Sequence, residues 1–177
     1  MTIGRPKFAR VFCVLLASVA GAQMMDEYQV KAGFVSSFAS FVEWPADTFG
    51  TPQEPIAICV LGQNPFGTAL NGLVAGKVVE GRTFVVRQIS DVQQTSDCQI
   101  LFVSASEHLR LRAILGSLGD RSVFSVGDTS DFIAEGGIVS LRTESGRVSI
   151  EINCDAARAK HLRISSRLLQ LARNVRR

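Results

Sequence analysis

The cysteines are the residues with the clearest chemistry. Cys59 lies inside one apolar run and Cys98 begins another, while Cys13 lies in the N-terminal apolar segment. Strands of this kind are often neighbours in a doubly wound sheet, so we predict a Cys59–Cys98 disulfide that closes a loop of 39 residues. Two buried free thiols are the alternative. Cys154 is expected to be a free thiol whose role stays open.

A glycine-bounded turn is the next candidate. Gly62, Asn64 and Gly67 follow an apolar run and precede an expected helix, where backbone N–H groups can bind an anion. Thr68 stands where a phosphate-binding loop has lysine, and the spacing of dinucleotide-binding glycines is absent. The turn is therefore a candidate anion or ligand site. The simpler alternative is a helix cap, with Asn64 as the N-cap residue.

Other catalytic arrangements do not assemble in the sequence. A GxSxG motif is missing, and Cys154 and His161 are seven positions apart, which corresponds to about 10 Å along a helix. His108 and His161 are the two histidines, which is too few for a histidine-rich metal site. We therefore predict no catalytic site, no metal site and no cofactor, and no arrangement of residues supports a hydrolase or an oxidoreductase.

The elements that would position these residues alternate between strand and helix. We expect an α/β fold: a Rossmann-like, mostly parallel sheet with helices on both faces and a C-terminal antiparallel β-hairpin at the sheet edge. Residues 23–177 are expected to form a single domain. The expected helices are 26–43, 64–71, 106–118, 155–161 and 165–175, and the expected strands are 55–61, 83–89, 98–104, 122–126, 137–143 and 147–153.

The first expected helix has two different faces. Val30, Phe34 and Phe38 lie on an apolar arc that Lys31 interrupts. The opposite side carries small residues, and it is either a plain solvated face or a surface that another protein contacts. The candidate partner surface consists of Gly33, Ser37, Ser40 and Trp44.

The N-terminus has the pattern of a secretory signal peptide over residues 1–22. A basic segment precedes the short apolar run 11–20, and Ala20-Gly21-Ala22 provides small residues for cleavage after Ala22. A membrane anchor is the alternative. Cleavage would leave 155 of the 177 residues and remove three basic side chains, so that 16 basic side chains balance the 16 acidic ones. We therefore expect no nucleic-acid partner and no membrane insertion after cleavage.

Short segments that together cover essentially the whole mature chain resemble the YfiR family. The matching segments, in chain order, are 27–32 with 41–45, 58–62 with 65–67, 81–82, 98–102, 131–132 with 136–137, 151–153 and 162–169. This resemblance implies a periplasmic regulator, not an enzyme, that binds the periplasmic domain of a membrane-bound diguanylate cyclase. Such binding would hold the cyclase inactive and lower cyclic di-GMP and biofilm formation. A periplasmic small-molecule binding protein without catalytic activity is the alternative, and a homodimer is a candidate assembly.

Overall fold

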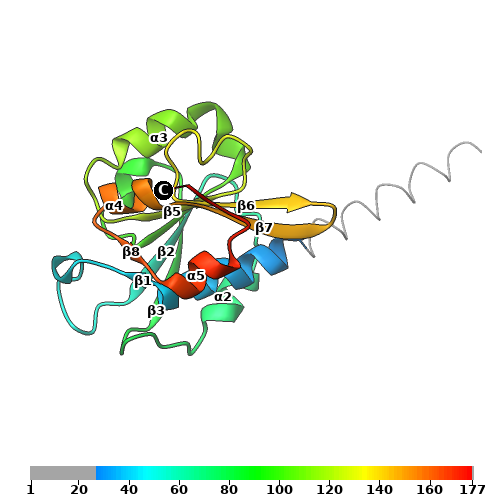
Figure 1. Cartoon of the computed structure of the whole chain (residues 1–177). Helices are drawn as coiled ribbons and strands as arrows, with labels where there is room; N and C mark the ends of the chain where they lie inside the picture. Colours follow the sequence, from blue (N-terminus) through cyan, green and yellow to red (C-terminus); the bar gives the residue numbers. More distant parts are fainter. Residues whose placement is uncertain (1–26, 177) are drawn as a thin grey trace, which may run out of the picture.

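The computed structural model of the protein describes residues 27–176 (Figure 1). The expected signal peptide and its cleavage after Ala22 lie outside these residues. Within them, a seven-stranded sheet has the order β3-β2-β4-β5-β6-β7-β9. The strands are β2 (Ile56–Leu61), β3 (Phe84–Ile89), β4 (Ile100–Val103), β5 (Phe124–Gly127), β6 (Val139–Glu144), β7 (Arg147–Asn153) and β9 (Asn174–Arg176).

The five strands from β3 to β6 are parallel, and β7 is antiparallel to β6. A separate small antiparallel pair joins β1 (Val42–Glu43) to β8 (Arg163–Ile164). These strands confirm the predicted α/β fold with a mostly parallel sheet and a β-hairpin.

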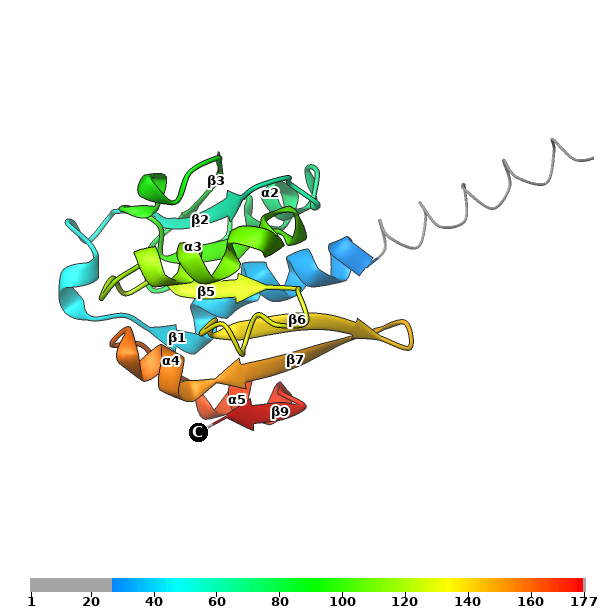
Figure 2. The same ribbon diagram turned by 90° about the horizontal axis from the view of Figure 1, so that it is seen from above.

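Helices cover both faces of this sheet, as Figures 1 and 2 show. The first helix (residues 27–38), α2 (Ala69–Val74) and α5 (Ser166–Leu171) lie on one face, and α3 (Leu111–Ser117) lies on the other. The remaining helical elements are α4 (Cys154–Ala159) and the 3-10 turns η1 (Ala39–Phe41), η2 (Ala46–Thr48), η3 (Val92–Thr95) and η4 (Ala105–Arg110).

The alternation of side chains along β2 explains why two helical layers are needed. All six residues of β2 are buried. Ile58 and Val60 belong to the core beneath the first helix, whereas Cys59 and Leu61 belong to the core beneath α3. Successive side chains of a strand point to opposite faces, so a continuous apolar run is stable only where both faces are covered.

Two segments differ from the sequence prediction. The predicted helix 165–175 ends earlier, and β9 pairs with β7, so the hairpin is not at the sheet edge. That pairing satisfies backbone groups that an uncovered β7 would expose. The predicted helix 26–43 ends at residue 38 and continues as η1 and β1, because the backbone from Val42 is extended and pairs with β8.

Two apolar side chains within predicted helices are exposed. Val30 is 46% exposed on the first helix, and Leu109 is 87% exposed. Leu109 belongs to the 3-10 turn η4, and α3 begins only at Leu111. Even on a regular α-helix, at about 100° per residue, Leu109 would lie on the side opposite Leu118 and so outside the stripe that Ile114 and Leu118 bury.

Candidate functional site

The chain reverses its direction of travel across the sheet at β2. The connection from β2 leads through α2 to β3 on one side, and the connection from β3 leads through η3 to β4 on the other side. The loops that follow β2 and β4 therefore leave towards opposite faces of the sheet. In open α/β sheets, ligands bind in the crevice that this divergence creates at the carboxyl ends of the strands.

A cleft of 660 Å³ lies at this position. We call it the switch-point cleft. Residues at the carboxyl end of β3 and in the connections after β2, β3 and β4 line it, including Gly62, Gln63, Gln88, Ser90, Gln94 and Ser106. Hydrogen bonds join its walls: Gln63 N donates to Ser106 Oγ over 3.0 Å, and Gln88 Nε2 donates to the Gly62 carbonyl over 2.5 Å. Side chains from three separate connections thus form one polar surface.

Gly62 is the residue of the predicted ligand turn that lines this cleft. Its φ of +89° lies in the region that favours glycine, and a Cβ there would overlap Ser106 and Glu107. Asn64 and Gly67 serve the turn itself. Asn64 Oδ1 accepts from Phe66 N over 2.9 Å, and Asn64 Nδ2 donates to the Gly67 carbonyl over 3.2 Å. Asn64 is therefore not the N-cap of the predicted helix 64–71, because α2 begins only at Ala69 with Thr68 as its N-cap residue. Gly62 remains a candidate ligand-site residue.

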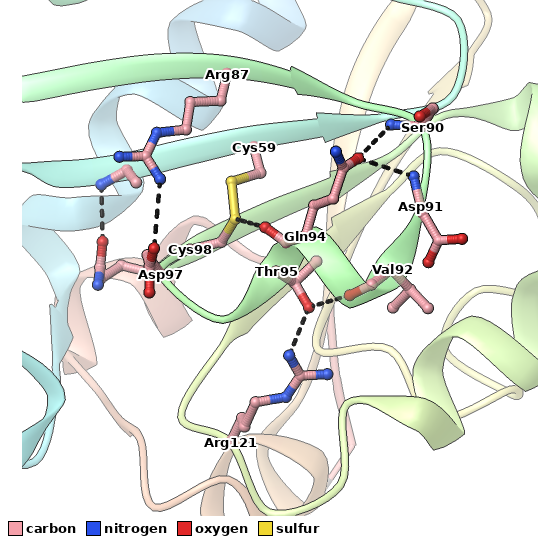
Figure 3. Close-up of a disulfide and its surroundings, with 12 residues drawn as sticks. Cys59, Arg87, Ser90, Asp91, Val92, Gln94, Thr95, Asp97, Cys98 and Arg121 are labelled. Atoms are coloured by element: carbon pink, nitrogen blue, oxygen red, sulfur yellow. Dashed lines mark hydrogen bonds and ion pairs between the residues drawn. A yellow bond between two sulfur atoms is a disulfide. The ribbon is translucent and has the colours of Figure 1, made fainter.

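A disulfide joins Cys59 in β2 to Cys98 just before β4 (Figure 3). The two Cα atoms are 5.9 Å apart, and both residues are buried. The pairing agrees with the sequence prediction, because β2 and β4 are neighbours in the sheet. Cys154, by contrast, is a buried free cysteine.

The segment 90–98 forms one wall of the cleft, and the disulfide at Cys98 anchors its C-terminal end. Within this segment, Gln94 Oε1 accepts from the backbone N–H groups of Ser90, over 3.0 Å, and Asp91, over 3.2 Å (Figure 3). The Asp91 side chain in turn accepts from Gln93 N over 2.8 Å. This reciprocal capping of η3 fixes the side chain of Gln94 relative to the end of β3.

A buried charge cluster, which the sequence reasoning missed, lies between the first helix and the end of β5. Lys31 Nζ lies 3.0 Å from Asp128 Oδ2 and 2.6 Å from Glu27 Oε1. Tyr28 donates its hydroxyl to the same Asp128 oxygen over 2.7 Å. The signal in the sequence was the interruption of the apolar arc by Lys31.

This environment changes the titration of two groups. Burial, followed by the hydrogen bond and the charge of Asp128, raises the pKa of Tyr28 above its usual range. Burial by itself would raise the pKa of Glu27, but hydrogen bonds with Lys31 and Thr143 and the Lys31 charge hold it below its ordinary value. The cluster therefore widens the pH range over which Tyr28 is protonated and Glu27 is ionised.

The four residues of the predicted partner surface are placed differently. Gly33 and Ser37 lie one turn apart on the first helix, where the Ser37 hydroxyl donates to the Gly33 carbonyl over 2.8 Å. Both are half-buried, and Ser40 is exposed. Trp44 lies beyond the helix and packs edge-on against Phe49, with ring centroids 6.3 Å apart. Trp44 is therefore partly a packing residue.

An apolar groove beside the first helix was also missed. Phe34, Val148 and Leu171 line a hollow of 530 Å³ between the first helix, the hairpin and α5. Leu171 is 60% exposed, and Val30, 46% exposed, lies one turn before Phe34 on the first helix. The sequence pattern assigned Val30 and Phe34 to the core, because a helical arc alone does not show where the neighbouring elements end.

The geometry defines a small doubly wound α/β domain with a polar switch-point cleft and an apolar groove. Among residues 27–176, no cluster of side chains is suited to hold a metal ion, and no helix has the length and apolar character needed to cross a bilayer. The chain belongs to the YfiR/HmsC-like family, whose profile matches residues 28–173. Membership supports a non-catalytic periplasmic regulator in cyclic di-GMP signalling in general.

Two solved structures are similar in fold. One is an ABC domain from Streptococcus pneumoniae in complex with L-Trp, with a TM-score of 0.51 and 12% identity over 68% of this chain and 55% of that one. The other is a conserved domain protein from Vibrio cholerae, with a TM-score of 0.50 and 13% identity over 68% of this chain and 54% of that one. The chain thus spans about half the length of these structures. No curated protein matches the sequence.

Proposed function

We propose that the protein is a periplasmic repressor of an inner-membrane diguanylate cyclase, which it inhibits by binding the periplasmic domain of that enzyme. The observation that carries this proposal is the family match, which spans residues 28–173 and so includes almost all of the described fold. Repression lowers cyclic di-GMP and thereby biofilm formation.

The mechanism is a shift between two states of the cyclase. A partner that binds the inactive state more tightly than the active state moves the equilibrium towards inactivity by the difference in the two affinities. A hundredfold preference corresponds to about 2.7 kcal/mol. The protein needs a surface that recognises one conformation, and it needs no reactive group.

The outer side of the first helix is the proposed docking surface. We call Val30, Gly33, Phe34, Ser37 and Leu171 the outer-helix surface. Val30 and Leu171 offer exposed apolar area. A Cβ at Gly33 would meet no atom within 4 Å, so a partner can approach the helix closely there. A patch of exposed apolar side chains is typical of sites where another protein binds.

The charges around this surface specify the partner further. The exposed side chains of Arg147 and Arg173 border the groove that Phe34 and Leu171 line. Glu144 lines the same groove and forms an ion pair with Arg173. An apolar segment of the cyclase domain with an acidic side chain opposite Arg147 would therefore complement both the groove and its rim. Ser40 and Trp44, at the end of the first helix, form the outer limit of this proposed surface.

Ser37→Arg tests the docking surface. The added side chain projects from the half-buried outer face, and it should release the cyclase without unfolding the protein. Ser117→Arg is the matched control, because Ser117 also donates its hydroxyl to a carbonyl of its own helix, over 2.7 Å, but lies on α3 at the other face of the sheet. Each variant is expressed in a deletion strain, and cellular cyclic di-GMP is measured together with the periplasmic amount of the variant.

The outcomes separate the function from the surface. Deletion should raise cyclic di-GMP, Ser117→Arg should restore its normal level, and Ser37→Arg should not. Unchanged cyclic di-GMP and attachment after deletion would refute repression. If Ser37→Arg also restores the normal level, repression stands and the outer-helix surface is wrong. Intact mass of the periplasmic protein tests export: cleavage after Ala22 is expected, and a chain that keeps Met1 contradicts it.

A further inference from the structure

We propose that the switch-point cleft binds a small neutral saccharide or polyol. The cleft lies at the carboxyl ends of β2, β3 and β4, and none of its lining residues belongs to the outer-helix surface. The inference therefore does not depend on cyclase repression. The volume of the cleft, 660 Å³, is within the range of about 300–1,000 Å³ that is typical of small-molecule sites.

The amide side chains of the cleft are held in place by the protein's own backbone. Gln88 uses its Nε2 to donate to the Gly62 carbonyl, which leaves its Oε1 as an acceptor. Gln94 uses its Oε1 to accept from Ser90 N and Asp91 N, which leaves its Nε2 as a donor. One fixed acceptor and one fixed donor thus border the same cleft, and neither must be reorganised when a ligand binds.

Hydroxyl groups complete this set of partners. Ser106 Oγ accepts from Gln63 N and keeps its own proton to donate. The side chain of Gln63 is exposed at the rim of the cleft. Each hydroxyl of a sugar is both a donor and an acceptor, so a row of adjacent hydroxyls matches alternating amide and hydroxyl groups.

The charges at the cleft argue against an anionic ligand. Glu107 is the charged side chain that lines it, and Lys, Arg and His are absent from the lining. Arg110 compensates Glu107 through two hydrogen bonds to Oε2, of 3.1 Å from Nε and 2.5 Å from Nη2. A phosphate or carboxylate would therefore face a carboxylate without a lining cation to offset its charge. A neutral ligand avoids this cost, and Glu107 Oε1 can accept from one of its hydroxyls.

The lining also has an apolar part that suits a sugar ring. Ile89, the last residue of β3, is 6% exposed and lines the cleft. It can contact C–H groups of one ring face while the amides bind the hydroxyls at the ring edge. At 6% exposure Ile89 adds only a small apolar contact, so hydrogen bonds provide most of the recognition.

The test is a titration of the mature protein followed by amide chemical shifts in NMR. Four probes are used separately: glucose, N-acetylglucosamine, inorganic phosphate and putrescine. At least one of the two sugars should give saturable shifts at millimolar concentration, concentrated on Gly62, Gln63, Ser90 and Ser106. Phosphate and putrescine should not shift these signals. Loss of saturation with both sugars, or stronger shifts with phosphate or putrescine, would overturn the proposal.

Two variants then locate the site. Gln63→Ala removes a side chain without removing the Gln63 N–Ser106 hydrogen bond, and it should weaken sugar binding at least about tenfold. Gln93→Ala is the matched control, because Gln93 is an exposed glutamine of η3 outside the cleft lining. The affinity of this variant for the sugar should equal that of the wild-type protein. Thermal unfolding of each variant confirms that it is folded. Equal sugar affinity in the two variants would place the binding elsewhere and refute the assignment.

Discussion

Lys31 and Asp128 form an ion pair in which both side chains are only 3% exposed, with Nζ and Oδ2 3.0 Å apart. The pair connects the first helix to the end of β5, across 97 residues of sequence. From the same helix, Tyr28 donates a hydrogen bond to Asp128 and Glu27 forms a second ion pair with Lys31. Because the outer side of this helix is the proposed docking surface, the ion pair sets how firmly that surface is attached to the sheet.

Lys31→Met should destabilise the protein by about 3–5 kcal/mol, because it leaves the buried carboxylate of Asp128 without its cation. The free energy of unfolding in urea measures this loss. The matched control is Arg158→Met, which breaks the ion pair with Asp155 between side chains that are 64% and 56% exposed. That control should cost about 1 kcal/mol or less.

The double variant Lys31→Met/Asp128→Leu separates the charge from the packing. Replacement of a whole buried ion pair by apolar side chains is often close to neutral, so this variant should recover much of the lost stability. A double variant that is less stable than Lys31→Met would contradict the charge explanation. It would show that the polar contacts of Tyr28 with Asp128 carry the stability instead.

The lowered pKa of Glu27 predicts a contribution to acid sensitivity. The ordinary value is 4.5, and the folded value lies below it because of Lys31 and Thr143. A carboxyl group with a depressed folded pKa contributes stability that is present above the unfolded pKa and is lost as the pH falls through the folded pKa. The contribution of Glu27 is therefore complete above about pH 4.5 and disappears below it.

Glu27→Gln should flatten the dependence of the unfolding free energy on pH in this acidic window. Urea titrations at a series of pH values, carried out on the wild-type protein and on the variant, measure the two slopes. Asp155→Asn is the control, since Asp155 is exposed and paired only with exposed Arg158. If Glu27→Gln and the wild-type protein lose stability in parallel below pH 4.5, the cluster does not stabilise the ionised carboxyl.

The buried strands and their disulfide could be predicted because their signals are local. A continuous apolar run such as β2 indicates a strand covered on both faces, and the positions of Cys59 and Cys98 on two such runs indicated their proximity. Lys31 could not be placed in the same way, since helical periodicity assigns a charged residue to solvent. Only the fold brings Asp128 to it.

The ends of elements were less predictable than their existence. The predicted helix 106–118 is present only in its second half, because the backbone after Ser104 first forms a 3-10 turn and α3 begins at Leu111. The C-terminal segment has the pattern of a helix up to residue 175, yet pairing with β7 makes its last residues a strand. Gly62 could be predicted as a site residue because it directly follows β2. Gln88 and Gln94 could not, because neither lies in a sequence motif that indicates ligand binding.

The disulfide should contribute substantially to stability. Cys59→Ser should lower the free energy of unfolding by about 4 kcal/mol, because the bond closes a loop of 39 residues in the unfolded chain. Cys154→Ser is the control, and its effect should be smaller because Cys154 forms no bond. Non-reducing peptide mapping of the periplasmic protein should show a Cys59–Cys98 peptide. A linked peptide containing Cys154, or three thiols open to alkylation, would contradict the pairing.

Gly62→Ala and Gly67→Ala test whether the crowding around Gly62 shapes the cleft. Both glycines have positive φ, +89° and +55°, so alanine is strained at each. A Cβ at Gly67 meets no atom within 4 Å, whereas a Cβ at Gly62 would lie 2.7 Å from Glu107 Oε1 and even closer to Ser106 Oγ. Gly67→Ala should therefore cost only the backbone strain of about 1–2 kcal/mol. Gly62→Ala should cost more, because the loops after β2 and β4 must also separate.

The contribution of the overlap is measured by adding Ser106→Ala to each glycine variant and comparing the free energies of unfolding. In the Gly62→Ala background, the loss of Oγ removes one overlapping atom, so the second substitution should restore part of the stability. In the Gly67→Ala background it should only remove the hydrogen bond with Gln63 N and lower stability further. A coupling free energy of the same sign and size in both backgrounds would show that Gly62 is required for its backbone conformation alone. A favourable coupling confined to Gly62 would show that it is required for the close approach of the two loops that form the cleft.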